Sequence, residues 1–316
     1  MVDILTTGAI NWDTNLFVKE IECSAMEMPV ERITRVPGGK AANVAVASAR
    51  LLGKNRCGIL GSLGDDEIGR LHLKIFEHEG VDTRGIFIAN NMESGQAHIL
   101  VDATGKNKIY THFGANASLN DKLLQNKVIS ELVEEATILV AMDPPIPYTK
   151  SLFEKAKGKK VIWAPGVRTL ISPEQVMQLL GLTSYLVLNE EELFKLTGKT
   201  DPEKGFSTLA ANSNSLRLIV TMGEDGAVLF EKGKSYVARG IKLGEAGFAV
   251  VNTVGCGDAF IGCFAASIAE GMDDVSALER ANYAGAYKAT KHETRGSPRK
   301  EELDEFIHIL HDSDIA

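Results

Sequence analysis

The feature that most constrains the fold of this chain is a repeated alternation of short apolar runs with longer segments of helical period. Such alternation is typical of βαβ units, whose strands pair in parallel and whose helices cover both faces of one sheet. The runs that predict core strands are Ile4–Ala9, Cys57–Gly61, Thr137–Ala141, Lys160–Trp163, Tyr185–Leu188, Leu218–Thr221 and Ala227–Phe230. The segments that predict helices are Ala42–Leu52, Glu67–Gly80, Leu119–Glu135, Pro173–Leu180, Glu190–Thr197, Phe260–Glu270 and Val275–Lys291. The sequence therefore predicts a doubly wound α/β sandwich around a mostly parallel sheet.

Two segments, at about residues 14–36 and 95–113, break this rhythm by alternating apolar and polar residues. The second contains a turn sequence, Asp102 to Gly105, which predicts a hairpin. We expect both to form a small antiparallel β lid over the carboxyl ends of the strands, where open α/β sheets bind ligands. An ordinary edge hairpin is the alternative. With 316 residues, 44% of them apolar, we expect a single domain over residues 1–316.

The charge balance disfavours nucleic acid as a partner. Lys and Arg number 34 against 42 Asp and Glu, which gives a net charge of −8 that repels a phosphate backbone. The basic clusters Lys155–Lys160 and Lys288–Lys300 are short and interrupted, so we interpret them as solvated ends of helices or strands.

The cysteines and the apolar segments favour a reduced, cytoplasmic location. The four cysteines, Cys23, Cys57, Cys256 and Cys263, form no C-x-x-C pair, which argues against a metal site or a disulfide framework. The chain starts without a basic leader, and its longest apolar stretch is too short to cross a bilayer. No membrane attachment is expected.

Two common nucleotide motifs are absent. Gly198-Lys199-Thr200 resembles the end of a P-loop, but Leu193 stands where that motif requires glycine, so Gly198 predicts a helix C-cap. Phe260 occupies the third glycine position of a G-x-G-x-x-G motif that would start at Gly255. A nicotinamide-dependent dehydrogenase therefore lacks its fingerprint.

The segment Asn252–Asp258, which reads N-T-V-G-C-G-D, precedes a helical pattern and predicts an anion hole. Gly255 and Gly257 flank the small Cys256, so backbone N–H groups can converge at a helix N-terminus, where the macrodipole favours negative charge. The same dipole favours an ionised Asp258, which could accept a proton from an attacking hydroxyl. The alternative is that Asp258 only caps the helix.

A second glycine-rich segment, Gly38–Asn43, precedes an Ala/Val-rich helix. Its glycines let a small polyol approach the backbone, and Lys40 and Asn43 offer donors and an acceptor. Asn11 and Asp13, after the first strand, add to the groups that hydroxyl recognition needs. Taken singly, these residues also suit simple turns and loops.

Together these motifs resemble the ribokinase-like carbohydrate kinases, the phosphofructokinase-B family, and most closely its ribokinase and nucleoside-kinase members. Gly38–Asn43 resembles the first family signature. Asn252–Asp258 resembles the second, which is usually written D-T-x-G-A-G-D. The matching segments follow in the family's order along nearly the whole chain: Gly38–Asn43, Gly61–Asp66, Gly114–Asn116, Asn189–Glu192, Thr221–Gly226 and Asn252–Asp258. The resemblance implies a ribokinase-like three-layer α/β/α sandwich with a small antiparallel β lid, and a possible homodimer through that lid.

The resemblance also implies residue roles. It makes Asp258 the general base, and makes the amides of Gly255, Cys256 and Gly257 the groups that hold the transferring phosphoryl. It assigns Asn189 to phosphate and, through water, Glu192 to Mg²⁺, in keeping with the tendency of Mg²⁺ to retain waters. The nucleotide-binding residues would be Thr221, Gly223, Gly226 and Asn282. The substrate-binding residues would be Asn11, Asp13, Gly38, Gly39, Lys40, Asn43 and Asp143.

Three positions depart from the family pattern. Asn252 replaces an aspartate that is associated with monovalent-cation activation, which puts potassium dependence in doubt. Cys256 replaces alanine; its amide should still serve the anion hole, although a helix N-terminus can also make a thiol reactive. Arg168 resembles an arginine of members with acidic substrates, but a surface salt bridge is the favoured interpretation.

The predicted function is an ATP- and Mg²⁺-dependent kinase that phosphorylates a hydroxyl of a small sugar or ribose-containing substrate. The alternative is a nucleoside kinase of the adenosine or cytidine type, in which Trp12 and Phe113 could stack on a base. Less favoured are a ketodeoxygluconate-type sugar-acid kinase and a non-catalytic sensor.

Overall fold

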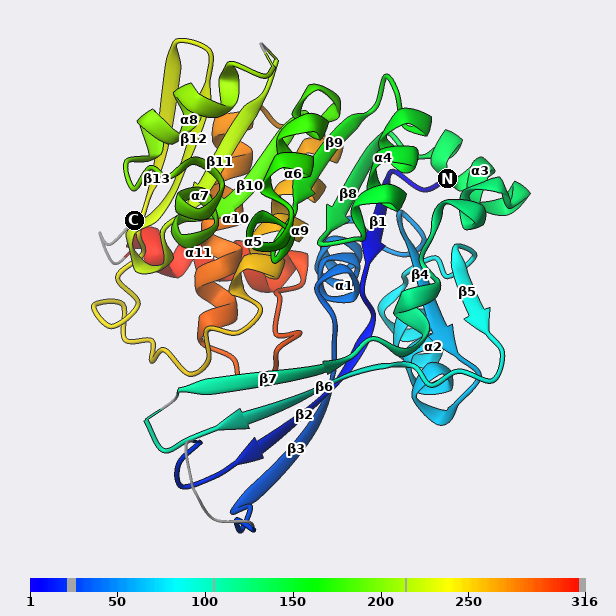
Figure 1. Ribbon diagram of the computed structural model, residues 1–316. Helices are drawn as coiled ribbons and strands as arrows, with labels where there is room; N and C mark the ends of the chain where they lie inside the picture. The colour runs from blue at the N-terminus through cyan, green and yellow to red at the C-terminus, as the bar shows by residue number, and fades with distance from the viewer. Residues whose placement is uncertain (22–26, 105, 214, 313–316) are drawn as a thin grey trace.

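The computed structural model describes residues 1–21, 27–104, 106–213 and 215–312 (Figure 1). Cys23 and Gly105 therefore lie outside the described residues. The main sheet has nine strands in the order β13-β12-β11-β10-β9-β8-β1-β4-β5. Its strands are β1 (Ile4–Gly8), β4 (Cys57–Gly64), β5 (Ile86–Ala89), β8 (Ile138–Met142), β9 (Lys160–Ala164), β10 (Tyr185–Asn189), β11 (Arg217–Thr221), β12 (Gly226–Glu231) and β13 (Lys234–Arg239). All neighbours from β5 to β11 are parallel, and β12 and β13 add an antiparallel edge.

Successive strand residues enter two separate apolar cores, one on each face of the sheet. In β10, Tyr185 and Val187 belong to one core, whereas Leu186 and Leu188 belong to the other. The first core is covered by α1 (Lys40–Leu52), α2 (Glu67–Glu79), α9 (Cys256–Ala269), α10 (Asp274–Ala289) and α11 (Lys300–Asp312). The second is covered by α3 (Lys127–Glu135), α4 (Ile146–Lys155), α6 (Pro173–Leu179), α7 (Glu190–Thr197) and α8 (Pro202–Ala210). This confirms the predicted three-layer sandwich.

The chain reverses its path across the sheet at β1. From β1 it passes through β4 to β5 on one side, and later crosses to β8 and its successors on the other. Open α/β sheets bind ligands at such a switch point, outside the carboxyl ends of the strands. Gly8 ends β1 with φ 140°, and a Cβ there would collide with the Met142 carbonyl oxygen of β8. The glycine therefore allows β1 to leave the sheet close to its neighbour.

A small four-stranded sheet extends from this edge, below α1 in Figure 1. Its order is β3 (Arg32–Gly38), β2 (Asn11–Phe17), β6 (Gly95–Val101), β7 (Asn107–His112). The β6/β7 hairpin lies where the sequence predicts it. The predicted small antiparallel sheet is confirmed by the pairs β2/β3 and β6/β7, although the central strands β2 and β6 run parallel. Both strands follow strands of the main sheet, β1 and β5, and leave the same edge in the same direction.

The remaining elements show where periodicity misleads. The predicted helix Leu119–Glu135 is two helices, η2 (Asp121–Gln125) and α3, because the Asn126 side chain accepts hydrogen bonds from the amides of Val128 and Ile129 and starts α3 anew. The helix predicted from Phe260 begins earlier, at Cys256. The prediction missed β5, β13, α4, α8, α11 and the one-turn helix α5 (Arg168–Ile171). The remaining 3₁₀ turns are η1 (Gly114–Ser118), η3 (Leu180–Leu182) and η4 (Gly223–Asp225).

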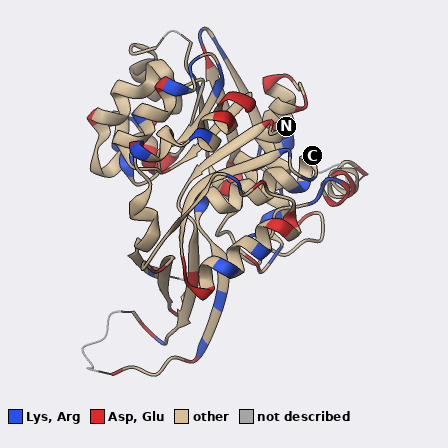
Figure 2. Cartoon of the chain, turned by 90° about the vertical axis from the view of Figure 1, so that its right-hand side faces the viewer, with Lys and Arg blue, Asp and Glu red and all other residues tan. Residues whose placement is uncertain are grey.

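Basic and acidic residues are mixed across the elements seen in Figure 2. The interpretation of Lys288–Lys300 as a solvated cluster is wrong for two of its cations, because Lys288 is 0% and Arg295 7% exposed. Within the part of the chain described, no helix is long and apolar enough to span a membrane. Cys57, Cys256 and Cys263 are free thiols.

Candidate functional site

The predicted site residues gather at the carboxyl edge of the main sheet. Parallel strands β1, β8, β9, β10 and β11 all end there, and α4, α5 and α7, which follow β8, β9 and β10, begin there. Three groups of residues arrive from different elements. One lies at the N-terminus of α9, one at the junction of β2, β3 and α1, and one along the ends of β10, β11 and β12.

The N-terminus of α9 is left open by its own residues. Gly255 is the N-cap, with φ 90°, and no side chain among the described residues caps the helix. A Cβ on Gly255 would collide with the Thr294 carbonyl oxygen, whereas Gly257 has open space around its missing Cβ. The alternative that Asp258 is the N-cap is wrong, because Asp258 lies in the first turn. Amides of this terminus can therefore face an anion.

Asp258 is held by a chain of hydrogen bonds that crosses from α9 to α1. Asn43 Nδ2 donates to Asp258 Oδ2 over 2.7 Å. Arg295 Nε donates to Asn43 Oδ1 over 2.8 Å, and Arg295 Nη2 donates to the Gly38 carbonyl over 2.6 Å. Since the guanidinium can only donate, it fixes the Asn43 amide with its NH₂ group toward Asp258.

Opposing effects act on the pKa of Asp258. Burial raises it, whereas the hydrogen bond from Asn43 and the charges of Lys40, Arg295 and Lys288 lower it; the pKa lies above the ordinary aspartate value. The helix dipole alone had suggested the opposite direction. A raised pKa brings a carboxylate closer to the range in which it works as a base.

Asp13 and Gly38 lie side by side where the small sheet joins α1. A Cβ on Gly38 would collide with the Asp13 carboxylate, so glycine is needed there for space. Burial raises the pKa of Asp13 to about 6, and the Asp258 charge adds to the rise while Arg295 opposes it. Asp13 and Asp258 therefore belong to one site, in which the charge of Arg295 lowers the pKa of both carboxyl groups. Gly39, with φ 91°, caps α1 beside them.

Asn11 is positioned by Asn116, which was identified from the sequence only as the last residue of the Gly114–Asn116 motif. Asn116 Nδ2 donates to Asn11 Oδ1 over 2.8 Å, and Asn116 Oδ1 accepts from the Ile10 amide over 2.9 Å. The buried His72 donates through Nε2 to the Asn11 carbonyl over 3.1 Å. Burial lowers the pKa of His72 to about 3, so the ring is neutral at physiological pH.

Lys40 and Asp143 approach each other across the switch point. A Cβ on Gly166 would lie 2.9 Å from Lys40 Nζ and 3.1 Å from Asp143 Cβ, so Gly166 keeps this corner open. Burial raises the pKa of Asp143 to about 6, against the charges of Lys40 and Arg168. Arg168 Nε lies 3.3 Å from Asp143 Oδ1, which confirms the expected salt bridge but places it in a half-buried corner.

The predicted phosphate and magnesium residues form the cap of α7. Glu192 N donates to Asn189 Oδ1 over 2.8 Å, and Asn189 N donates to Glu192 Oε2 over 3.1 Å, which makes a capping box. Burial raises the pKa of Glu192, while Lys40 opposes the rise. Lys40 therefore acts on Glu192, Asp143 and Asp258 alike.

The predicted nucleotide residues follow one another along neighbouring strands. Thr221 pairs with Asn189 at the end of β11, and Gly226 pairs with Arg239 in β13. Asn282 Nδ2 donates to the Arg239 carbonyl over 2.7 Å. Gly223 and Gly226 have φ of 58° and 96°, which glycine adopts at little cost. These residues therefore line one continuous edge from β10 to α10.

Sequence reasoning missed Arg295, and it read Lys288 as solvated. Neither stands in a motif, and the partner of Arg295, Asn43, is 252 positions away. Cys256 was found, and burial raises the pKa of its thiol, which argues against the reactive-thiol alternative.

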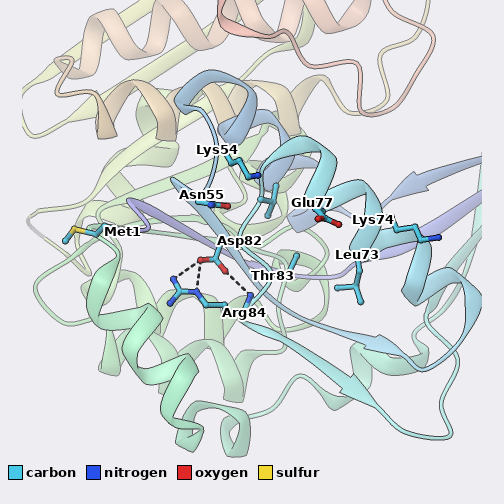
Figure 3. A pocket seen from close by; sticks show the side chains of 10 residues that line it. Met1, Lys54, Asn55, Leu73, Lys74, Glu77, Asp82, Thr83 and Arg84 are labelled. Carbon is cyan, nitrogen blue, oxygen red and sulfur yellow. Dashed lines mark hydrogen bonds and ion pairs between the residues drawn. The ribbon is translucent and has the colours of Figure 1, made fainter.

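A surface hollow of about 700 Å³ lies away from these residues (Figure 3). It is lined by Met1, by the turn after α1, by one side of α2 and by the segment that follows α2, where Arg84 forms an ion pair with Asp82. None of its lining residues is a predicted site residue. This hollow is therefore separate from the predicted site.

Comparisons with known proteins agree with this arrangement. A sequence model of the pfkB family carbohydrate kinases matches residues 1–301. Ribokinase of Dictyostelium discoideum is 29% identical over 320 residues, covering 96% of this chain and 99% of the relative. The ATP-dependent ribose-1-phosphate kinase of Halopiger xanaduensis is 28% identical over 307 residues, covering 97% and 98%. The crystal structure of ribokinase from Thermotoga maritima superposes with a TM-score of 0.85 at 26% identity, covering 98% of this chain and all of that one.

The family match and the ribokinase relatives make this chain a phosphotransferase with an alcohol group as acceptor. The chain belongs to the pfkB family of carbohydrate kinases.

Proposed function

We propose that this kinase transfers the γ-phosphoryl group of ATP to a hydroxyl of a free, ribose-like sugar. The observation that carries the proposal is the contact between Asn43 and Asp258, because it joins the polyol-binding cluster to the open terminus of α9. The relatives named ribokinase, ribose-1-phosphate kinase and deoxyribokinase act on pentose compounds according to their names, which supports the substrate class.

In the proposed reaction, Asp258 takes the proton of the acceptor hydroxyl as its oxygen attacks the γ-phosphorus. A new O–P bond forms, the bond from the γ-phosphorus to the bridging oxygen breaks, and ADP leaves with that electron pair. The amides of Gly255, Cys256 and Gly257 would hold the charge on the transferring group. Asn43 keeps the carboxylate oriented, and Asn11, Asp13 and Lys40 would hold the sugar hydroxyls.

The residues around Glu192 fit a Mg²⁺ that keeps most of its waters. No group of three or more His, Cys, Asp or Glu in the described ranges could cage a metal, and the capping box engages only one Glu192 oxygen. Mg²⁺ commonly binds through one or two carboxylates and substrate phosphates. When bound with ATP, the ion would neutralise phosphate charge. Asn189 and Glu192 would orient it through water, while Thr221, Gly223, Gly226 and Asn282 would bind the nucleotide.

Two observations favour a free sugar over the alternatives. Trp12 contacts His72 of α2 edge-on, with ring centroids 5.5 Å apart, and successive strand residues point to opposite faces, so Trp12 points away from the face of Asp13. It is therefore poorly placed to stack on a nucleoside base. Arg168 is neutralised by Asp143, which weakens the case for a sugar acid.

The proposal includes a role for the small sheet as a lid that excludes water from the reaction. Its strands β2 and β3 carry the substrate cluster at their ends nearest α1. A homodimer through this sheet is part of the same proposal, and light scattering of the purified protein would give a mass of one or two chains.

An acceptor panel tests the substrate class. Purified protein with ATP and Mg²⁺ is assayed for ADP release with ribose, fructose, ketodeoxygluconate, phosphosugars, adenosine and cytidine, each against a blank without acceptor. We expect the highest kcat/KM with ribose or a close pentose. Turnover confined to nucleosides would overturn the free-sugar assignment.

A further inference from the structure

Lys288 is a buried cation that the reaction as described does not use. It lies on α10, is 0% exposed, and donates from Nζ to the Asn252 carbonyl oxygen over 2.7 Å. Among the described residues no carboxylate lies within 4.0 Å of its ammonium group. Burying an ammonium without an ion-pair partner costs several kcal/mol. Because burying the Lys288 ammonium group costs this much free energy, we looked for a function of its charge.

The carbonyl that Lys288 binds opens the loop that leads into the α9 terminus. Asn252 Oδ1 accepts from the Val254 amide over 3.0 Å, and Asn252 Nδ2 donates to the His292 carbonyl over 2.8 Å. All three polar side-chain and carbonyl groups of Asn252 are thus bound within the chain. Three residues later the loop reaches Gly255, the N-cap of α9.

These contacts do not fit a bound monovalent cation at Asn252. Such an ion needs oxygen ligands, yet the Asn252 carbonyl faces an ammonium group and its side-chain oxygen faces an amide. The side chain also lacks the negative charge of aspartate. The doubt about potassium that the sequence raised is therefore supported by the donors that surround this position.

We propose that Lys288 is a positioning residue that serves as a built-in cation beneath the anion hole, holding the Asn252–Gly255 loop and adding positive charge where the transferring phosphoryl group gathers negative charge. This proposal rests on the proposed function of Asp258 and the α9 terminus. The Lys288 charge already reaches both Asp258 and Cys256, because it lowers the pKa of each group against the effect of burial. The same burial lowers the pKa of Lys288 itself.

The test compares Lys288→Met with Arg280→Met. Arg280 is a matched control, since it lies on the same helix, is 8% exposed and pairs with Glu270 over 2.7 Å, about 12 Å along the helix axis from Lys288. We expect Lys288→Met to lower kcat about 10- to 100-fold with little change in the KM of the acceptor, as for loss of charge stabilisation in the transition state. Arg280→Met should lower the melting temperature and leave kcat nearly unchanged.

Two further measurements separate charge from packing. Methylammonium should restore part of the activity of Lys288→Ala, whereas tetramethylammonium, which has no N–H donor, should not. In the wild-type enzyme, replacing K⁺ with tetramethylammonium should leave kcat unchanged; this measurement stands even where a Lys288 variant fails to fold.

A folded Lys288→Met variant with kcat within about threefold of wild type would overturn the proposal. So would a stimulation of wild-type kcat by K⁺ of about tenfold or more, because it would reveal a separate cation site. Asp258→Asn, assayed in parallel, distinguishes a failure of the proposed function from a failure of the proposed role of Lys288. If it stays active, the site assignment itself fails; if it is inactive while Lys288→Met is fully active, only the role of Lys288 fails.

Discussion

The N-termini of α7 and α9 lie at the same sheet edge but are finished in opposite ways. At α7 the Asn189 and Glu192 side chains close a capping box, so the helix satisfies its own first turn. At α9 the N-cap is Gly255, and no described side chain caps it. A cap stabilises a helix by about 1 kcal/mol, so α9 forgoes stability that α7 keeps. We infer that the uncapped α9 terminus, which lies beside the Asp258 carboxylate, is where the phosphoryl group of the proposed reaction would complete the helix.

The glycines of α9 offer the largest expected difference. Gly257→Ala should lower kcat about 10- to 100-fold, because a methyl group in the open space at this terminus would crowd the phosphoryl group that the proposal places there. Its melting temperature should stay close to wild type, since nothing in the protein lies near that methyl. Steady-state kinetics and a thermal melt measure the two effects.

Gly255→Ala is the matched partner. Its φ of 90° and the Thr294 carbonyl make alanine strained there, so unfolding should become easier by about 1–3 kcal/mol. If Gly257→Ala instead lost stability and kept its kcat, the terminus would be structural rather than a binding site.

At the capped N-terminus of α7, a substitution should affect stability more than kcat. Asn189→Ala removes the side chain that accepts from Glu192 N, and should destabilise the protein by about 1 kcal/mol. The expected kinetic change is a rise in the KM for Mg-ATP, smaller than the loss of kcat in Gly257→Ala. Denaturant unfolding measures the first effect, and steady-state kinetics at varied Mg-ATP measures the second. A loss of kcat larger than that of Gly257→Ala would contradict the comparison.

A further expected effect concerns pH and Asp13, whose pKa is raised by burial near the N-terminus of α9. Because the folded pKa of about 6 lies above the ordinary value of 3.8, the folded state binds the proton more tightly than the unfolded state. Asp13 therefore contributes stability below about pH 4, and this contribution is lost as pH rises through 6.

Melting curves of Asp13→Asn and wild type between pH 4 and 8 check this sign. The variant should gain melting temperature relative to wild type as pH rises through 6, and it should raise the KM of the acceptor. A gap between the two curves that is independent of pH would show that Asp13 is not held in the environment described.

Much of the main sheet was predictable because its strands are buried on both faces and read as continuous apolar runs. The predicted runs Thr137–Ala141 and Leu218–Thr221, which correspond to β8 and β11, are examples. β13 was missed because most residues of Lys234–Arg239 are exposed at the sheet edge, so the segment does not form an apolar run. The parallel pairing of β2 with β6 depends on where the chain leaves the main sheet, which local periodicity does not record.

The motif residues of the site were predictable because glycines and polar groups cluster at strand ends. The residues that position these motif residues could not be predicted from the sequence. Arg295 and Lys288 look like surface cations in the sequence, and their burial follows from partners on α1 and in the loop before α9. Asn116 was visible only as a motif member, and its bonds to Ile10 and Asn11 depend on the tertiary fold.

The most direct test of the central claim is a single-turnover measurement of phosphoryl transfer from ATP to ribose by Asp258→Asn, with nucleotide affinity measured on the same sample. If Asp258 is the base at the open terminus of α9, transfer should slow by about 100- to 10,000-fold while nucleotide still binds. Transfer at a rate close to wild type would contradict the account.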